Sequence, residues 1–197
     1  MKRIFDVIMS SIGLIVVSPI FLILAIWIKI DSDGPVFYRQ VRVGKGNKDF
    51  RIYKFRTMRP DADKIGGLIT IGGRDPRVTR SGYYIRKYKL DEFPQLINVL
   101  KGEMSLVGPR PEVRKYVDLY TPRQLHVLDV RPGITSLASI RYRNENDILA
   151  AAEDPDKAYI EQIMPDKLVI DLEYVSKANL VNDIKLIFST LREIILK

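Results

Sequence analysis

The sequence predicts a mainly helical α+β protein that begins with a membrane segment. Three observations lead to this class: an apolar stretch from Val7 to Ile28 without an ionisable side chain, two short β-like runs between residues 36 and 55, and helical signals that dominate from Tyr83 onward. The chain has 197 residues, of which 46% are hydrophobic and 28% charged, which suits one folded domain with a short appendage. We expect an anchor over residues 1–34 and a domain over residues 35–197.

The apolar stretch is long enough to reach across a bilayer. As a helix it measures roughly 33 Å, which matches the hydrocarbon core. A secretory signal peptide is a competing interpretation, but Asp6 interrupts the basic start and no small-residue cleavage site follows Ile30. Trp27 lies near the end of the stretch, where an interfacial aromatic residue is expected. We therefore expect a membrane anchor rather than a cleaved leader.

Basic residues flank the apolar stretch on both sides. Since basic flanks prefer the cytoplasm, this pattern favours both ends on one face of the membrane. Ser18 and Pro19 lie near the middle, where the proline removes a backbone donor and kinks a helix. We expect a re-entrant helix-break-helix, with a kinked spanning helix as the alternative, because a serine hydroxyl can satisfy the carbonyl that the proline frees. The basic residues are Lys2 and Arg3 before the stretch and Lys29, Arg39, Arg42, Lys45, Lys48, Arg51, Lys54, Arg56 and Arg59 after it.

The C-terminal segment has the pattern of an amphipathic helix. Its apolar residues recur at helical spacing, and basic residues are available to meet lipid headgroups. One interpretation is an interfacial helix on the membrane surface, and the other is a helix packed on the core of the domain. The apolar positions are Leu180, Ile184, Ile187, Leu191 and Ile194, and the basic ones are Lys185, Arg192 and Lys197.

Two β-like runs open the folded domain. Val36–Val43 and Phe50–Phe55 are joined by a turn over residues 44–47, which predicts a hairpin. In the second run the apolar alternation slips by one residue, so we expect a β-bulge near Ile52. The glycine-rich stretch from Asp61 to Arg80 predicts a mobile loop, of the kind that often covers a site.

Helical patterns occupy most of the remaining chain. They begin near Ile85 and are interrupted by turn residues such as Gly102. The predicted helices are Ile85–Leu90, Pro94–Leu100, Val113–Tyr120, a stretch around Ile148–Ala152, and Met164 to the C-terminus.

The adjacent carboxylates Asp91 and Glu92 are the sharpest candidates for chemistry. Asp91 is expected to cap the helix that runs to Leu100, which would favour its ionised form. An ionised aspartate there could attack phosphorus, or together with Glu92 hold a magnesium ion. The plainer interpretation is a helix cap beside a solvated glutamate, and spacing alone does not separate the two.

Several cations near turns are candidates for binding phosphate. Gly108-Pro109-Arg110-Pro111 presents an arginine between two prolines, which suits bidentate phosphate binding or, on the plainer interpretation, a stiff turn with a structural salt bridge. The absence of cysteine and the single histidine leave oxygen ligands for any metal. The net charge of +8 attracts anions in general, but no motif of a nucleic-acid-binding module occurs. The further candidates for binding phosphate are the cations Lys54, Arg56, Arg86 and Arg131 and the uncharged Thr57.

Read in order, six segments closely resemble the bacterial sugar transferases, also called monotopic phosphoglycosyl transferases. The resemblance runs from the anchor to about Ser139, and its specificity comes from the combined order of the segments. The segments are Lys54-Phe55-Arg56-Thr57-Met58, Asp75-Pro76-Arg77-Val78-Thr79-Arg80, Leu90-Asp91-Glu92-Phe93-Pro94-Gln95-Leu96, Asn98-Val99-Leu100-Lys101-Gly102, Met104-Ser105-Leu106-Val107-Gly108-Pro109-Arg110-Pro111 and Arg131-Pro132-Gly133-Ile134-Thr135.

The resemblance implies transfer of a phospho-sugar from a UDP-sugar to a polyprenyl phosphate, such as undecaprenyl phosphate, with release of UMP. It implies that Asp91 is the nucleophile of a covalent intermediate, that Glu92 assists it, and that Mg²⁺ is required. It also implies a re-entrant anchor broken at Ser18 and Pro19, and a catalytic domain on the cytoplasmic face of the bacterial inner membrane, in contact with its lipids. Such a transfer is the first membrane step of glycoconjugate or polysaccharide assembly.

The chain departs from the family pattern in a few places. Ser136 stands where a glycine commonly follows the threonine, and Phe93 replaces a frequent leucine, which affects substrate detail more than activity. The stretch 141–147 lies where the family diverges, so sugar choice is expected there. The chain resembles the minimal catalytic form, and the oligomeric state stays open, a homodimer being one option. A UDP-sugar hydrolase and a membrane-tethered anion-binding scaffold are the rival functions.

Overall fold

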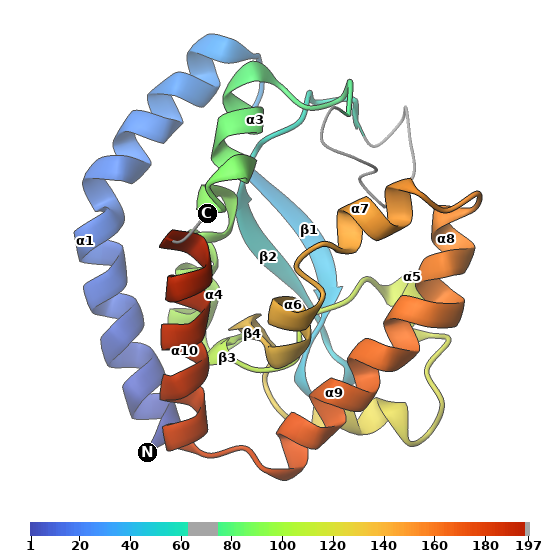
Figure 1. Ribbon diagram of the computed structural model, residues 1–197. Coiled ribbons are helices and arrows are strands. Elements are labelled where there is room, and N and C mark those ends of the chain that lie inside the picture. The colour runs from blue at the N-terminus through green and yellow to red at the C-terminus, as the bar shows by residue number, and fades with distance from the viewer. Residues whose placement is uncertain (63–74, 196–197) are drawn as a thin grey trace.

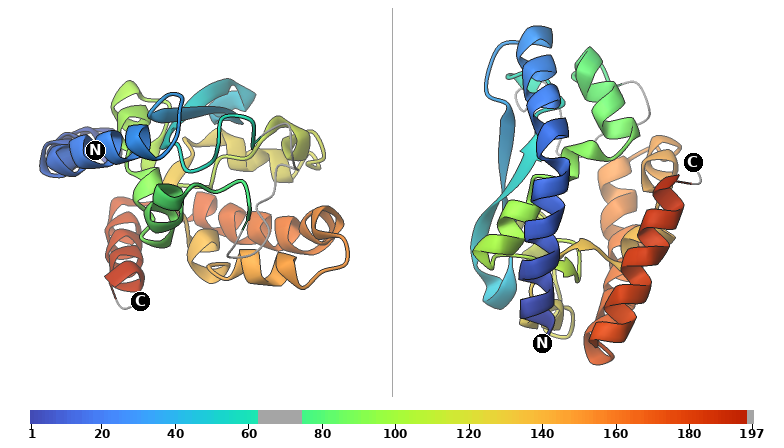
Figure 2. Two further views of the ribbon diagram at one scale, coloured as in Figure 1. Left: turned by 90° about the horizontal axis from the view of Figure 1, so that it is seen from above. Right: turned by 90° about the vertical axis from the view of Figure 1, so that its left-hand side faces the viewer.

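A computed structural model describes residues 1–62 and 75–195 (Figure 1). The protein is mainly helical with two small two-stranded sheets, as the sequence predicts. Helix α1 lies along one edge of the molecule, and α5, α7 and α8 lie on the opposite side (Figures 1 and 2). The elements are α1 (Lys2–Asp31), β1 (Phe37–Val43), η1 (Lys45–Asn47), β2 (Asp49–Phe55), α3 (Arg80–Lys87), η2 (Leu90–Glu92), α4 (Gln95–Lys101), β3 (Ser105–Val107), α5 (Arg114–Val117), η3 (Gln124–Asp129), β4 (Gly133–Thr135), α6 (Leu137–Arg141), α7 (Glu145–Ala150), α8 (Pro155–Ala158), η4 (Tyr159–Ile163), α9 (Met164–Ser176) and α10 (Leu180–Ile195).

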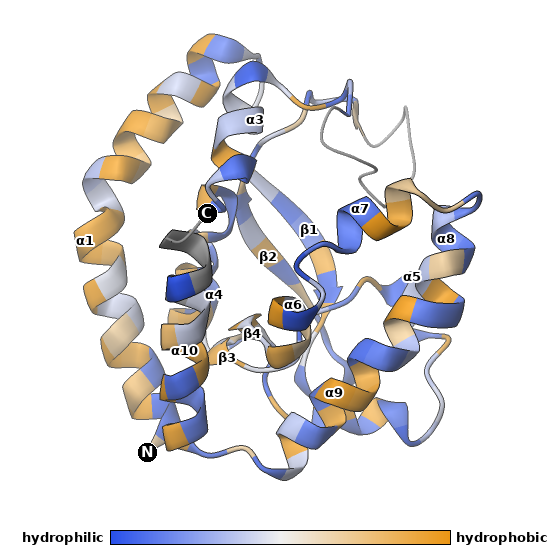
Figure 3. Ribbon diagram, viewed as in Figure 1, coloured by the Kyte–Doolittle hydropathy of each residue, from blue (hydrophilic) through white to orange (hydrophobic). Residues whose placement is uncertain are grey.

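Helix α1 contains the whole apolar stretch from Val7 to Ile28 and is long and apolar enough to cross a membrane. Figure 3 shows apolar residues along most of its length. Most of them are exposed; Ile15, for example, leaves 72% of its surface uncovered. Such a surface is rare on a soluble protein and calls for an apolar environment. The exposed apolar residues of α1 are Ile4, Ile8, Met9, Ile12, Ile15, Val16, Ile20, Leu22, Ile23, Ile26, Trp27 and Ile30.

The expected break at Ser18 and Pro19 is not an interruption of α1, because the helix continues through both residues. Pro19 cannot donate to the carbonyl of Ile15, and the hydroxyl of Ser18 donates to that oxygen instead, at 2.8 Å. This local hydrogen bond keeps the carbonyl satisfied in a helix of continuous secondary structure. The re-entrant path of the anchor through a bilayer stays a prediction.

The hairpin is confirmed, but the predicted bulge is wrong. β1 and β2 pair residue for residue from Phe37 with Phe55 to Val43 with Asp49, without an extra residue. The apparent slip arises because both faces of β2 are covered. Ile52 packs in a cluster with Val99 and Met104, whereas Phe55 on the other face packs against α1. Two buried faces therefore produce a sequence pattern like that of a bulge.

Helix α3 begins earlier than the sequence pattern indicates. Thr79 caps it by accepting a hydrogen bond from the backbone N–H of Gly82 at 3.0 Å, and the helix ends at Lys87. Gly82 has no room for a side chain, since a Cβ there would lie 2.0 Å from the carbonyl oxygen of Thr57. This close approach fixes α3 against the chain that leaves β2. Most of the glycine-rich loop expected between Asp61 and Arg80 lies outside the described residues.

The parallel pair of β3 and β4 joins two segments that are far apart in the sequence. The backbone N–H of Gly133 donates to Pro109 at 2.9 Å, and that of Gly108 donates to Thr135 at 3.1 Å. A Cβ on Gly133 would lie 2.1 Å from the nitrogen of Gly108, so only glycine permits this contact. The pairing therefore fixes the backbone that leads into Arg110.

A second core lies on the side of the molecule away from α1. It is built from α5, η3, α7, η4 and α9 around Tyr116, Leu149 and Tyr159. The C-terminal helix α10 contacts β3 and β4, so the packed interpretation of this amphipathic helix describes its inner face. Its exposed apolar side chains are Val181 and Phe188 among the residues whose burial is described.

The N-terminal end of α1 is bound to the folded domain by buried polar contacts. Asp6 accepts hydrogen bonds from the hydroxyl of Ser105 at 2.9 Å and the backbone N–H of Leu106 at 3.2 Å. Arg3 donates to the carbonyls of Val99 and Leu100, at the C-terminal end of α4, where a cation is favoured. Lys2 forms an ion pair with Asp183 of α10 and donates to Val107.

The C-terminal end of α1 is bound to the same domain. The carboxylate of Asp31 accepts hydrogen bonds from the backbone N–H and the hydroxyl of Ser81, at 2.8 and 2.7 Å. The guanidinium of Arg56 donates to the carbonyls of Ser32, Asp33 and Pro35, directly after the helix. Both ends of the apolar helix are therefore held by polar groups of one folded unit.

Candidate active site

The acidic pair lies in η2, a short 3₁₀ turn between α3 and α4. The sequence predicted that Asp91 caps α4. This prediction is wrong, because α4 begins only at Gln95. Pro94 lacks the N–H that a continuous helix would direct to the carbonyl of Leu90, and that carbonyl accepts from Phe93 at 3.3 Å instead. The turn is entered through Lys89, whose backbone adopts the left-handed conformation with φ of 56°.

A cluster of charges surrounds Glu92. Its carboxylate accepts from the ammonium of Lys54 at 3.1 Å and from Nη2 of Arg110 at 2.6 Å. The side chains of Lys54 and Glu92 are 17% and 18% exposed, while that of Arg110 is 34% exposed. The structure thus brings together three predicted site residues from β2, η2 and the segment after β3. The Arg110 side chain is the most exposed of the three.

The two adjacent carboxylates have opposite electrostatic environments. Burial alone would raise the pKa of Glu92, but Arg110 and Lys54 hold that pKa well below its usual value. Burial raises the pKa of Asp91, the charge of Lys54 opposes this, and the charge of Glu92 adds to it. The expectation that helix N–H groups would favour an ionised Asp91 is therefore wrong. In the described part of the chain, no hydrogen bond or ion pair holds the Asp91 carboxylate.

Asn98 positions α4 against the hairpin beside this cluster. Its side-chain oxygen accepts from the backbone N–H of Tyr53 at 2.8 Å, and its amide donates to the carbonyl of Arg51 at 2.9 Å. The side chain is fully buried and also donates to Glu103 at 2.7 Å. Since Tyr53 precedes Lys54, these bonds fix the strand position from which Lys54 reaches Glu92.

A second charged cluster, centred on Glu112, lies behind the Arg110 segment. The sequence analysis did not identify it. Glu112 accepts from the hydroxyl of Tyr159 at 2.6 Å and lies 3.6 Å from the guanidinium of Arg42. Arg42 also donates to the carbonyl of Pro111 at 3.1 Å. These contacts join β1 and η4 to the Arg110 segment. The acidic residue two positions after Arg110 was the available signal.

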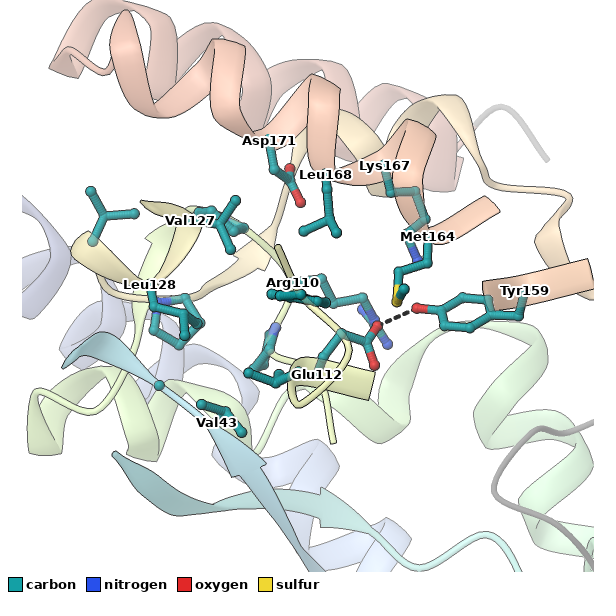
Figure 4. Close-up of a pocket in the computed structure, with 17 residues that line it drawn as sticks. Val43, Arg110, Glu112, Val127, Leu128, Tyr159, Met164, Lys167, Leu168 and Asp171 are labelled. Carbon is teal, nitrogen blue, oxygen red and sulfur yellow. Dashed lines mark hydrogen bonds between the residues drawn. The ribbon is translucent and has the colours of Figure 1, made fainter. Parts of the chain in front are cut away.

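A cavity of about 30 Å³ lies behind the Arg110 segment and could hold about two water molecules (Figure 4). Asp171 of α9 points into it, and its Oδ1 is buried without a hydrogen-bond partner. Burial raises the pKa of Asp171 to about 7. Lys167 lines the same cavity and forms an ion pair with Glu145 at 2.8 Å.

The remaining predicted residues lie at varying distances from the acidic pair. The charge of Arg86 acts on Asp91, so Arg86 belongs near the site. Pro111 lines the cavity, and Thr57 accepts from the backbone of Thr79 and packs on α3. Arg131 donates to the carbonyl of Gly102, at the end of α4 away from Asp91.

Arg56 is not brought into the cluster. Only 5% of the residue is exposed, and its Nε and both terminal nitrogens donate to backbone carbonyls after α1. Its charge is thus used at the junction between the anchor and the domain. We leave Arg56 out of the proposed substrate-binding set for this reason.

The donor set of the site fits magnesium only as an ion shared with the substrate. Among residues 1–62 and 75–195 no group of three or more metal-binding side chains occurs. Asp91 has a free carboxylate, and Glu92 is already bound by two cations. Mg²⁺ is commonly held by one or two carboxylates together with phosphate oxygens of a substrate. Asp91 and Glu92 are the residues that would hold it in this way.

Comparison with known proteins decides the family. A sequence model described as "Bacterial sugar transferase" matches residues 1–197. The chain belongs to the bacterial sugar transferase family. The acidic pair and the Arg110 segment of this bacterial sugar transferase come from the segments on which the resemblance rests.

Three relatives of this bacterial sugar transferase are 38–41% identical to it. UDP-N-acetylgalactosamine-undecaprenyl-phosphate N-acetylgalactosaminephosphotransferase of Aeromonas hydrophila is 41% identical over 98% of this chain and 43% of that protein. Exopolysaccharide production protein PSS of Rhizobium leguminosarum bv. phaseoli is 38% identical over 96% of this chain and 92% of that protein. UDP-glucose:undecaprenyl-phosphate glucose-1-phosphate transferase of Escherichia coli (strain K12) is 38% identical over 96% of this chain and 39% of that protein. The chain spans less than half of the Aeromonas and Escherichia proteins.

Proposed function

We propose that this protein transfers a phospho-sugar from a UDP-sugar to a polyprenyl phosphate, such as undecaprenyl phosphate, and releases UMP. The observation that carries the proposal is the different treatment of two adjacent carboxylates: Glu92 is bound by Lys54 and Arg110, whereas no hydrogen bond or ion pair within residues 1–62 and 75–195 holds Asp91. When the environments of two neighbouring acids shift their pKa values in opposite directions, the two acids can take separate roles in a reaction. The names of the Aeromonas and Escherichia relatives, which act on undecaprenyl phosphate, support the choice of acceptor.

In the first displacement, a carboxylate oxygen of Asp91 attacks the β-phosphorus of the UDP-sugar. The bond from that phosphorus to the oxygen of UMP breaks, and UMP leaves with the bonding electron pair. Burial, which raises the pKa of Asp91, makes its carboxylate a stronger nucleophile. Arg110, whose side chain is partly exposed, and Lys54 stabilise negative charge on the phosphate oxygens.

In the second displacement, a phosphate oxygen of the polyprenyl phosphate attacks the phosphorus bound to Asp91. The bond between phosphorus and the Asp91 oxygen breaks, which restores the carboxylate and gives the polyprenyl diphospho-sugar. Glu92 keeps Lys54 and Arg110 in place through both displacements, because both donate to its Oε1. When bound, magnesium supplies further neutralisation of the diphosphate charge.

The proposal places both ends of α1 on the cytoplasmic face of the membrane, in a monotopic arrangement. Asp6 near one end and Asp31 at the other bind polar groups of the same folded domain. A helix that spans a bilayer would carry its ends to opposite faces, where one domain could not bind both. The chain has no cysteine, so a single cysteine appended at the N-terminus reports its location cleanly. Protection from membrane-impermeant maleimide in sealed right-side-out vesicles, with labelling after lysis, is expected.

The chemistry is tested with Asp91→Asn. We expect UMP release from UDP-sugars in the presence of Mg²⁺ and polyprenyl phosphate to fall at least about 10³-fold, because the nucleophile is gone. The wild-type protein mixed with the donor alone should gain the mass of one phospho-sugar, and the variant should not. Asp118→Asn, which changes an exposed carboxylate outside the site, is the matched control and should retain activity.

Two outcomes would replace the proposal by its rivals, and a third would reject the assigned nucleophile. Free sugar phosphate formed without any lipid acceptor identifies a hydrolase. Full activity of Asp91→Asn would falsify the assigned nucleophile. No turnover with any UDP-sugar, together with binding of anionic ligands, identifies a scaffold.

A further inference from the structure

The backbone at Lys89 is in a conformation that lysine rarely adopts. Among non-glycine residues of the described chain, only Asn47 and Lys89 have positive φ angles, 60° and 56°. Asparagine adopts this region readily, whereas a long side chain is disfavoured there by its Cβ. Lys89 follows the C-terminal end of α3, and its N–H donates to the carbonyl of Arg86 at 3.0 Å. Glycine is the residue that helices favour at this position.

The side chain of Lys89 does nothing that would explain its presence in this position. It is exposed, and no hydrogen bond or ion pair of its ammonium occurs within residues 1–62 and 75–195. The neighbouring cations differ, since Lys54 and Arg110 bind Glu92, and the ammonium of Lys87 lies over the ring of Tyr88 at 5.5 Å. Within the described residues, the positive charge of Lys89 is therefore not committed to a partner.

That charge lies beside the reactive carboxylate. Lys89 is two residues before Asp91, and its charge is among those that lower the pKa of Asp91 against the effect of burial. The left-handed turn at Lys89 leads directly into η2, so the same turn sets the backbone positions of Lys89 and Asp91. A strained residue kept next to a site points to use of its side chain.

We propose that Lys89 binds a phosphate group of the substrate at Asp91, as an additional cation to those that hold Glu92. This inference rests on the proposed transfer reaction and adds a residue to it. The phosphate belongs either to the diphosphate of the nucleotide sugar or to the polyprenyl phosphate, and both present the same chemistry to an ammonium group. A free ammonium suits this task because it gives up no existing ion pair when the anion arrives.

The test uses the opposite demands of the backbone and the side chain. Lys89→Gly relieves the left-handed backbone, so its melting temperature should equal or exceed that of the wild type, by up to about 4 °C. Its kcat/KM for UMP release should nevertheless fall about tenfold, as expected for one lost charged contact. Lys89→Asn, which also tolerates this backbone, should show the same loss, and Lys89→Arg should recover most of the activity.

Lys87→Ala is the matched control, because it removes an exposed lysine two residues away and should leave kcat/KM within about twofold. KM is measured for each substrate with the other saturating. A rise for the UDP-sugar assigns the contact to the diphosphate, and a rise for the polyprenyl phosphate assigns it to the lipid phosphate. Activity of Lys89→Gly and Lys89→Asn within twofold of wild type overturns the inference, as does a parallel fall in activity and melting temperature for both. Absence of UMP release by the wild type would instead reject the proposed function itself.

Discussion

Arg56 and Arg110 both follow a strand, and both carry a guanidinium toward a neighbouring segment, but they use it differently. At the junction after α1, Arg56 is buried and donates to three backbone carbonyls. In the cluster of the acidic pair, Arg110 shares Glu92 with Lys54 and leaves about a third of its side chain exposed. The first region holds the anchor to the domain, and the second keeps charge available at an open surface.

The difference is whether each guanidinium can exchange its present hydrogen-bond acceptor for a phosphate. Carbonyls of the backbone cannot move away from Arg56 without opening the chain between α1 and β1, so this arginine is part of the fold. A carboxylate such as Glu92 can share a cation with an arriving phosphate, because phosphate offers the same bidentate geometry. An arginine bound to backbone carbonyls therefore indicates a structural role, and one bound to a carboxylate at a surface indicates binding.

Of the two arginines, Arg110 should have the larger effect on activity when it is substituted. Arg110→Met removes a cation that stabilises charge in the transition state, and we expect kcat/KM to fall about 10³-fold, or about 4 kcal/mol. Steady-state UMP release measures this. The melting temperature should change little, because Lys54 still pairs with Glu92. A large loss of stability with activity intact would contradict the division between the two arginines.

Arg56→Met should show the reverse behaviour. The carbonyls of Ser32, Asp33 and Pro35 would lose their donors, and we expect the free energy of unfolding to fall by about 3 kcal/mol. Denaturation in detergent measures the loss. Activity per folded molecule should stay near that of the wild type. A selective rise in KM with unchanged stability would return Arg56 to the substrate-binding set.

Asp171, in the cavity behind Arg110, should make the free energy of unfolding depend on pH. The guanidinium of Arg56 and the carbonyls that it binds do not titrate between pH 4 and 8. Burial raises the pKa of Asp171 to about 7, so the folded protein binds a proton that the unfolded chain has lost. Its contribution is fully present below about pH 4, the unfolded value, and is lost as the pH rises through about 7. Within this window the free energy of unfolding should fall by up to about 1.4 kcal/mol for each pH unit of increase.

Denaturation at several pH values, compared between the wild type and Asp171→Asn, isolates this contribution. The amide stays neutral throughout, so the difference in unfolding free energy between the two proteins should change between pH 4 and 7. A constant difference over that range would show that Asp171 is ionised in its cavity.

Between the two ends of α1, Ser18 and Pro19 offer the smallest effect. Ser18→Ala removes the hydroxyl that donates to the carbonyl of Ile15, and we expect a loss of about 1 kcal/mol. Pro19→Ala restores a backbone donor to that carbonyl, so Ser18→Ala should cost almost nothing in this background. A double-mutant cycle of melting curves in detergent measures the coupling. Additive effects would show that the hydroxyl does not serve the carbonyl freed by the proline.

The chain's local patterns predicted several elements for physical reasons that need no tertiary contact. The apolar run of α1 and the turn over residues 44–47 follow from composition over short windows. Gly102, which ends α4 with φ of 84°, was visible as a helix terminator. The bulge and the capping role of Asp91 were wrong, because burial of both faces of β2 and the missing N–H of Pro94 act beyond simple periodicity.

The sequence by itself determined the membrane segment, the hairpin, the order of motifs and, through them, the family. Only the tertiary structure decided which cations meet the acidic pair, since Lys54 and Arg110 come from segments far from Glu92 along the chain. It likewise separated Arg56 from Arg110 and placed Glu112 and Asp171 behind the site. Ion pairs and burial depend on distances in space, and a linear pattern contains no such distances until the chain is folded.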